Sequence, residues 1–366
     1  MKKTIYEKYA HLLVHYSLFL KKGETVFVRS THLAEPLLQE FYAEALRVGA
    51  HVDFMLDFQD KESIFFENTG VEQLKRVSPF QKEALETFDA YLNIMAPFNL
   101  RSLQNADRSK MNLHSEAMQA IQTTYNERTS SGKMKRSLCQ FPTDAAAQNA
   151  GMSLRDYEDF IFKSCFLYEE DPAEKWRELG RNQQKAVDLL NSRSLIRYVN
   201  PATDITFSVS GRTWINSDGK ANMPSGEVFT SPVEDSVNGY ITFDFPSIYS
   251  GNEVEGIRLE VKDGRVINWK ASRGQEFLDK IFEIPGARYF GEAAIATNYG
   301  ITRPTKNILF DEKIGGTVHM AIGQSYLHAG GKNQSSVHWD MIADMKTGGQ
   351  IFADGKLIYE NGQFSF

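Results

Sequence analysis

The spacing of apolar residues changes character about half-way along the chain. In the first half, stretches with apolar residues three or four positions apart alternate with short runs of consecutive apolar residues. The first pattern predicts amphipathic helices and the second predicts buried strands. Helices are expected at about 5–20, 33–48, 71–88 (broken near Pro79), 153–165 and 172–191, and strands at 25–28, 51–56 and 90–95. This alternation is typical of an α/β domain with a mostly parallel sheet.

Local signals support several of these helix ends. Gly49 occupies the place of a C-terminal glycine cap after the second helix. Ser153 and Asp156 have the spacing of a capping box, and Asp171-Pro172 provides an N-cap candidate followed by proline in the first turn.

In the second half the period becomes two. Apolar and polar residues alternate at 205–209 and 257–261, and Asp263-Gly264, Asp354-Gly355 and Asn361-Gly362 have the composition of tight hairpin turns. The long helical stretch expected here is 275–282. We therefore predict an α/β domain at 1–194 and a β-rich (α+β) metal-binding domain at 195–366.

Composition narrows the class of protein. The 366 residues carry a formal net charge of −6, which argues against a protein made mainly to bind nucleic acid, and we interpret the basic run at 128–136 as a solvated loop. Two cysteines are too few for a disulfide scaffold and fit a reducing compartment. No run of 18 apolar residues and no signal-peptide pattern occurs, so we expect a cytoplasmic protein without a membrane partner.

A histidine-rich window carries the strongest chemical signal. His319, His328 and His338 fall within twenty residues, and His338-Trp339-Asp340 forms a His-x-Asp pair. On a strand, the two outer side chains of this pair face the same way, about 6–7 Å apart at Cα. Imidazole and carboxylate together suit a divalent metal such as zinc. The alternative is a core histidine beside a strand-end aspartate.

Three carboxylates precede the histidines. Glu227 and Glu292 each stand among apolar or small residues, where a buried carboxylate needs a compensating cation. Glu312 belongs to an Asp-Glu pair before the glycine-bounded strand of His319. Strand-end, cap and turn roles remain open for all three. No helical zinc-protease motif, nucleophile elbow or phosphate-binding glycine loop is present, and neither Cys139 nor Cys165 has a context that favours a thiolate.

The order of these pieces resembles the M29 family of metallo-aminopeptidases, which includes the aminopeptidase T and aminopeptidase S group. The similarity spans most of the chain and is most specific in the second half. Its pieces are 222–230, Gly291-Glu292, 298–301, 311–319, Ser325-Tyr326 and 338–340.

This resemblance implies a dinuclear site with zinc, cobalt or manganese, acting on short peptides in a homodimer. The implied ligands are Glu227, Glu292, His319, Tyr326, His338 and Asp340. A glutamate that is not a ligand would serve as general base, with Glu292 the first candidate and Glu312 the second. Another dinuclear hydrolase of small amides or esters, and a non-catalytic metal-binding protein, are the alternatives.

Overall fold

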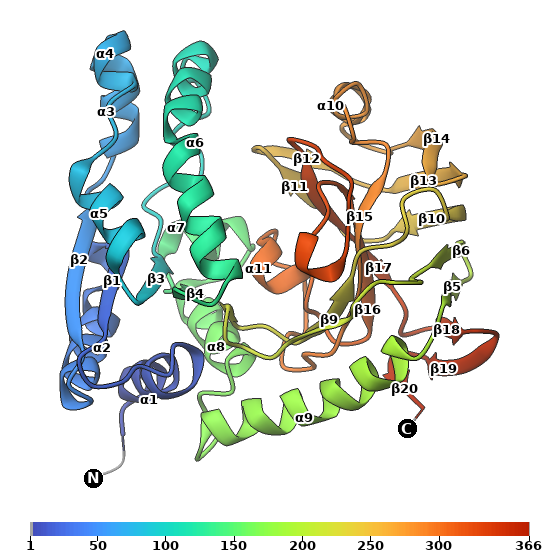
Figure 1. Cartoon of the computed structure of the whole chain (residues 1–366), viewed down its shortest axis with the longest axis horizontal. Coiled ribbons are helices and arrows are strands. Elements are labelled where there is room, and N and C mark those ends of the chain that lie inside the picture. The colour runs from blue at the N-terminus through green and yellow to red at the C-terminus, as the bar shows by residue number, and fades with distance from the viewer. Residues whose placement is uncertain (1–2, 366) are drawn as a thin grey trace. The chain divides into compact units, whose positions relative to one another are not determined.

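The computed structural model describes residues 3–365, and the chain forms two compact units (Figure 1). The first unit comprises Met1–Ala173 with Gly219–Met223, and the second comprises Glu174–Asp218 with Pro224–Phe366. The expected boundary at 194/195 therefore differs from this division. The reason is helix α9 (Pro172–Asn191), whose Ala186, Val187 and Leu190 are buried in the core of the second unit.

The first unit contains the expected parallel sheet. Its strand order is β2-β1-β3-β4-β8, and all four neighbouring pairs are parallel. The three strands predicted from apolar runs are confirmed, whereas β4 and β8 were not predicted. The strands are β1 (Thr25–Thr31), β2 (His51–Asp57), β3 (Ala90–Met95), β4 (Lys135–Gln140) and β8 (Asn222–Met223).

Helices precede and connect these strands. The predicted helix at 5–20 is α1, which continues as a π-helical turn, η1, and the predicted helix at 71–88 is two helices, α4 and α5. Neither α3 nor α6 was predicted. Of the 23 residues of α6, all within the described part of the chain, Ile121 is the buried one, so this helix has no apolar stripe to detect. The bounds are α1 (Ile5–Leu12), η1 (Leu13–Ser17), η2 (His32–Ala34), α2 (Glu35–Arg47), α3 (Lys61–Asn68), α4 (Val71–Leu74), α5 (Pro79–Thr87), α6 (Arg108–Ser130), α7 (Asp144–Asn149) and α8 (Leu154–Ser164).

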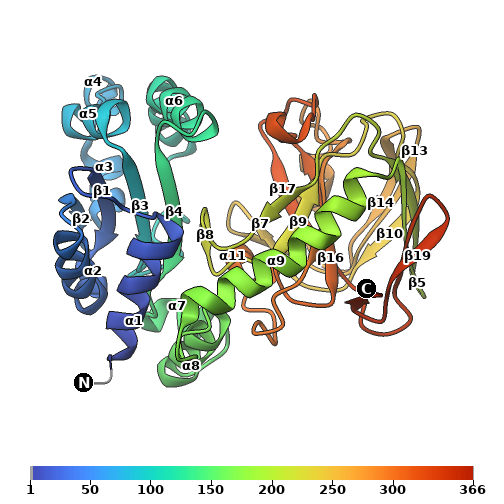
Figure 2. The same ribbon diagram turned by 60° about the horizontal axis from the view of Figure 1, so that its bottom comes forward.

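The second unit is rich in antiparallel strands, as expected (Figure 2). Its eight-stranded sheet has the order β14-β13-β10-β6-β5-β18-β19-β20, and its five-stranded sheet has the order β17-β16-β15-β9-β7. The strands are β5 (Leu195–Asn200), β6 (Thr203–Ser208), β7 (Ile215–Ser217), β9 (Glu227–Thr230), β10 (Asn238–Phe243), β11 (Ser247–Tyr249), β12 (Asn252–Val254), β13 (Ile257–Lys262), β14 (Arg265–Lys270), β15 (Phe290–Ala296), β16 (Thr317–Gly323), β17 (His338–Asp344), β18 (Gln350–Ala353), β19 (Lys356–Glu360) and β20 (Gln363–Phe364).

Short elements complete the second unit. They are α10 (Gln275–Ile281), α11 (Ile308–Asp311) and η3 (Leu327–Ala329). The predicted hairpin turns are present, because Asp263-Gly264 and Asp354-Gly355 have positive φ at both positions and join paired strands. No helix within residues 3–365 combines the length and the apolar character needed to cross a membrane.

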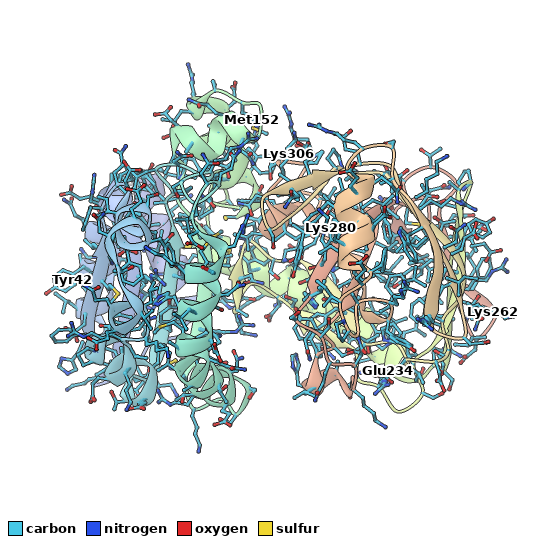
Figure 3. The ribbon with its side chains drawn as sticks, turned by 90° about the horizontal axis from the view of Figure 1, so that it is seen from above. Tyr42, Met152, Glu234, Lys262, Lys280 and Lys306 are labelled. Carbon is cyan, nitrogen blue, oxygen red and sulfur yellow. The ribbon has the colours of Figure 1, made fainter. Side chains whose placement is uncertain are left out.

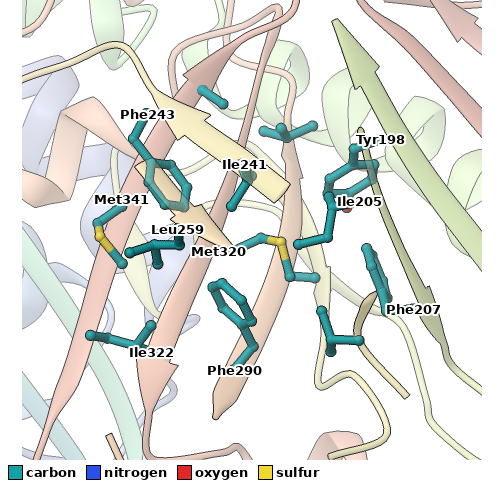
Figure 4. Close-up of a cluster of buried hydrophobic side chains, with 14 of the residues drawn as sticks. Tyr198, Ile205, Phe207, Ile241, Phe243, Leu259, Phe290, Met320, Ile322 and Met341 are labelled. Carbon is teal, nitrogen blue, oxygen red and sulfur yellow. The ribbon is translucent and has the colours of Figure 1, made fainter. Parts of the chain in front are cut away.

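The hydrophobic core of the second unit is built from both of its larger sheets (Figure 4). The eight-stranded sheet contributes Tyr198, Ile205, Phe207, Ile241, Phe243 and Leu259, and the five-stranded sheet contributes Phe290, Met320, Ile322 and Met341. One face of the five-stranded sheet thus packs in the hydrophobic core. Its other face is left for polar side chains.

Candidate metal centre

Strand alternation brings the predicted histidines to one face of the five-stranded sheet. In β16, Met320 belongs to the core, so the adjacent His319 points to the opposite face. In β17, Trp339 belongs to the core, so His338 and Asp340 on either side of it face the other way. Because β16 and β17 are paired, all three polar side chains lie close together.

Glu292 reaches this face through a β-bulge in β15. Phe290 belongs to the core, and in a regular strand Glu292 would point the same way. The register shifts between these two residues, and the core pattern resumes at Ala293, so Glu292 lies on the opposite face. Glycine is required between them, because a Cβ on Gly291 would lie 2.2 Å from the carbonyl oxygen of Gln324.

Small residues beside the polar ones leave room on this face. Ala294 pairs with His319, and Ala321 pairs with both Glu292 and Asp340 in the strand register. Larger side chains at these two alanines would fill the space between the carboxylates and the imidazoles. The alternation therefore places the potential ligands and two small residues on the same face of the sheet.

Glu227 enters from the start of β9, and its backbone is tightly fixed. Gly226 has φ +115°, and a Cβ there would lie 2.6 Å from Cβ of Asn298. The backbone carbonyl of Glu227 accepts a hydrogen bond of 2.5 Å from Nε2 of Gln183 in α9. The carboxylate is therefore held by the turn before it and by the helix that packs on this unit.

Glu292 lies at the centre of the cluster. Its Oε1 is 3.6 Å from Nε2 of His319, and its Oε2 is 3.2 Å from Nε2 of His338. Glu227 Oε2 lies 3.4 Å from Nε2 of His319, and Asp340 Oδ2 lies 3.5 Å from Nε2 of His338. Two groups of potential ligands result, Glu227–Glu292–His319 and Glu292–His338–Asp340, each with ligand atoms within 4.8 Å of one another. Glu292 belongs to both.

The remaining predicted residues lie beside these groups. The Tyr326 hydroxyl is 3.4 Å from Nε2 of His338. Glu312, just after α11, forms a third group with His319 and Asp340. The structure thus brings together all seven residues singled out from the sequence as ligands or general bases.

His338 and His328 have different surroundings. Nδ1 of His338 lies 2.8 Å from the carbonyl oxygen of Gln324, so it acts as the donor and leaves Nε2 toward Glu292. His328, the third histidine of the window, packs its ring against Tyr326 and Phe229. It belongs to none of the groups of potential metal ligands found within residues 3–365.

Sequence reasoning missed Lys313. Its side chain is fully buried, with Nζ 3.5 Å from Oε1 of Glu227 and in contact with Oε1 of Glu312. A lysine next to a glutamate in a glycine-bounded segment looks like an ordinary turn residue, so only its burial identifies it. The two carboxylates raise the pKa of Lys313 despite its burial, and the ammonium compensates part of their negative charge.

Burial and ion pairing shift the pKa values of the whole group. Burial raises the pKa of Glu227 to about 7 and that of Asp340 to about 6. Burial alone would also raise the pKa of Glu292, but its ion pairs with His319 and His338 outweigh burial and lower the pKa to about 2. Burial lowers the imidazole pKa values, yet the surrounding carboxylates outweigh it and raise them to about 9 for His319 and about 10 for His338. The histidines therefore hold protons at neutral pH that a bound cation would displace.

The donor set fits divalent metal ions. Within residues 3–365, Oε2 of Glu227, Nδ1 of His319 and Oδ1 of Asp340 are buried polar atoms without a hydrogen-bond partner. Buried carboxylate oxygens without a hydrogen-bond partner are costly unless a cation or proton joins them. Oxygen and imidazole nitrogen are ligands that zinc, cobalt and manganese accept.

The sequence model of the M29 family, described as a thermophilic metalloprotease, matches residues 2–364. The chain belongs to the M29 family. Burial also argues against cysteine chemistry in this member, because it raises the pKa of the Cys139 thiol to about 12 and that of Cys165 further still.

Named relatives of this M29 chain are aminopeptidases. Aminopeptidase 2 of Geobacillus stearothermophilus is 29% identical, over 98% of this chain and 97% of the relative. Aminopeptidase PepS of Streptococcus thermophilus is 29% identical, over 92% of this chain and 91% of its own. The solved structure of wild-type AmpT from Thermus thermophilus covers 99% of both chains with a TM-score of 0.86 at 22% identity, which establishes the common fold.

Proposed function

We infer that this protein is a metal-dependent aminopeptidase that removes N-terminal residues from short peptides. The observation that carries this inference is the pair of carboxylate–imidazole groups joined through Glu292 in an M29 family member. The relatives named as aminopeptidases support the exopeptidase activity.

We propose that the site holds two divalent cations, zinc, cobalt or manganese. Glu292 belongs to both groups of ligand atoms, so its carboxylate would help to hold both cations. Tyr326 would have to lose its phenol proton to bind a cation. Burial raises the pKa of this phenol well above 10, so only a bound cation would displace the proton. The proposed ligands are Glu227, Glu292, His319, Tyr326, His338 and Asp340.

Glu312 is the residue we assign as general base. When bound, the two cations lower the pKa of a water molecule and polarise the scissile carbonyl. Since Glu292 is enclosed by two histidines, Glu312 is the carboxylate left to accept the proton from water and return it to the leaving amine. Lys313 holds the Glu312 carboxylate in place. The acidic lining also gives the free α-amine of a peptide a partner that a blocked N-terminus lacks.

Release of leucine from a short peptide tests this function directly. The protein would be stripped with EDTA and supplied with zinc, cobalt or manganese in turn, with the same peptide N-acetylated as a matched control. We expect activity only with metal and only on the free N-terminus. Hydrolysis of the acetylated peptide or of a small ester instead would favour another dinuclear hydrolase, and metal binding without hydrolysis would favour a non-catalytic protein.

We also propose a homodimer formed through the first unit. β2 is the edge strand of the parallel sheet, and Phe54 and Leu56 on it are 38% and 45% exposed. Tyr42 and Leu46 of α2 are exposed as well, and Figure 3 labels Tyr42 at the surface. The ring centroids of Tyr42 and Phe54 are 5.6 Å apart. An exposed apolar strand edge is a site for pairing with another strand.

Light scattering tests the dimer. Phe54→Glu is expected to yield monomers, whereas Ile267→Glu, at a more exposed apolar position in β14, should leave the mass unchanged. A dimer that persists in Phe54→Glu would exclude this surface.

We propose a cytoplasmic location on the basis of the two free, buried cysteines, and cell fractionation would check it.

A further inference from the structure

A second set of potential metal ligands lies within the first unit. His11 is in the last turn of α1 and His15 is in the π-helical turn that continues it, so the two rings project from the same side of the helix. Glu44 of α2 completes the set, and the three residues offer ligand atoms within 4.8 Å of one another. None of the three is among the residues proposed to hold the two cations in the second unit.

The geometry is close to that of a zinc site. The ring centroids of His11 and His15 are 4.3 Å apart, and Nε2 of His15 lies 2.7 Å from Oε1 of Glu44. Ligand atoms around a tetrahedral zinc ion are about 3.3–3.5 Å apart, given bonds of about 2.0–2.1 Å. The zinc ion would replace the proton between His15 and Glu44 and separate them by less than about 1 Å. The His15 side chain is 35% exposed, so it is free to make this adjustment.

Glu44 is already oriented as a ligand. Its Oε2 accepts a hydrogen bond of 2.6 Å from Nη1 of Arg47, while Oε1 faces His15. Metal-binding carboxylates are commonly held by such a second partner, which fixes the oxygen that binds. The Glu44 side chain is 13% exposed, whereas the Arg47 side chain that pairs with it is 64% exposed.

An opening leads to the His11 end of the set. His11 lines a cavity of about 620 Å³ together with Tyr168, Glu170 and Asp171, all from the same unit. The two acidic residues offset the charges of Lys3 and Lys8, which line the same cavity. The cavity gives a hydrated ion a path and leaves room for water at its open coordination position.

We propose that His11, His15 and Glu44 form a peripheral site for one zinc ion, which fastens α1 to α2. Two imidazoles and one carboxylate are a recognised zinc donor set, with water as the fourth ligand. The site is distinct from the dinuclear centre in its residues and independent of peptide hydrolysis. Its role is to cross-link two helices that cover the parallel sheet.

Counting bound zinc tests this proposal. Wild-type protein and His15→Ala would be stripped with a chelator and titrated with zinc against a chromophoric competitor. We expect wild-type protein to retain one equivalent more than His15→Ala, while hydrolysis of a Leu-peptide stays equal. His51→Ala, which removes an exposed histidine of the same unit, is the matched control and should match wild-type protein. Because zinc is counted directly, the outcome holds even if no peptide is cleaved.

Equal zinc content in wild-type protein and His15→Ala would overturn the proposal, as would a third equivalent held only in millimolar zinc. If His15→Ala does not fold, His11→Gln provides the same test with a smaller change. We expect added zinc to raise the melting temperature of wild-type protein more than that of either variant. The absence of that difference in a folded variant would equally reject the site.

Discussion

Glu292 and Glu312 differ in what surrounds their carboxylates, and their proposed roles rest on this difference. Glu292 lies between two imidazoles, whereas Glu312 contacts the ammonium group of Lys313. Glu312→Gln is expected to lower kcat by about 10²–10⁴-fold with metal content unchanged, because only proton transfer is lost. Glu292→Gln is expected to lose metal instead. Steady-state kinetics and metal analysis of both variants would distinguish the general base from the metal ligand. Loss of metal in Glu312→Gln would contradict the proposal that Glu312 is the general base.

Metal affinity of the proposed dinuclear centre is expected to rise with pH. A cation needs His319 and His338 without their Nε2 protons, and their pKa values in the folded protein are about 9 and about 10. Protons therefore compete below these values, and each displaced proton changes the affinity by about tenfold per pH unit. Competition titrations between pH 6 and 8 should show at least this slope. An affinity that does not depend on pH would mean that these histidines are not displaced ligands.

The candidate site residues were proposed from a resemblance, and sequence patterns alone account for only some of them. The spacing of the His-x-Asp pair predicts its geometry, because any strand places residues 338 and 340 on the same face. Lys313 carries no such signal, since its importance follows from complete burial between two carboxylates. Burial of a charged residue depends on distant segments, and no local pattern reports it.

At the scale of elements, one backbone conformation fixes the start of β9. Gly226→Ala is expected to destabilise the protein by about 1–3 kcal/mol and to lower activity, because the strained turn would move Glu227. Gly355→Ala is the matched control, since it has φ +78° but no atom within 4 Å of the added Cβ. Urea unfolding and kcat/KM would compare the two variants. Equal losses in both would show that backbone strain alone, and not contact with Asn298, matters.

Apolar periodicity and short apolar runs predicted several of the strands. The alternating runs of the second half gave strands where expected, and three short apolar runs gave β1, β2 and β3. Periodicity failed for α6, which has almost no buried face, and for the bulge at Gly291, where a regular period would turn Glu292 into the core. Bulges break the very alternation from which strands are predicted, so their consequences appear only in three dimensions.

At the scale of the whole molecule, metal is expected to stabilise one unit more than the other. All six proposed ligands of the dinuclear centre belong to the second unit, and a ligand at 100 times its Kd stabilises a folded unit by about 2.7 kcal/mol. Calorimetry of the His15→Ala variant, with and without EDTA, isolates this effect from the peripheral site. We expect EDTA to lower the melting temperature of the second unit by several degrees. An unchanged transition would contradict metal binding there.

The short strand β8 has a consequence for the order in which the protein assembles on the ribosome. β4 ends at Gln140, yet its parallel neighbour β8 is supplied by Asn222–Met223. About 80 further residues must be synthesised before this edge of the sheet is covered, which takes roughly 4–16 s at ordinary translation rates. During this interval the nascent chain carries an unpaired β4 edge. We expect pulse proteolysis of stalled chains to find the first unit sensitive when synthesis stops before residue 219 and protected once residue 223 has emerged.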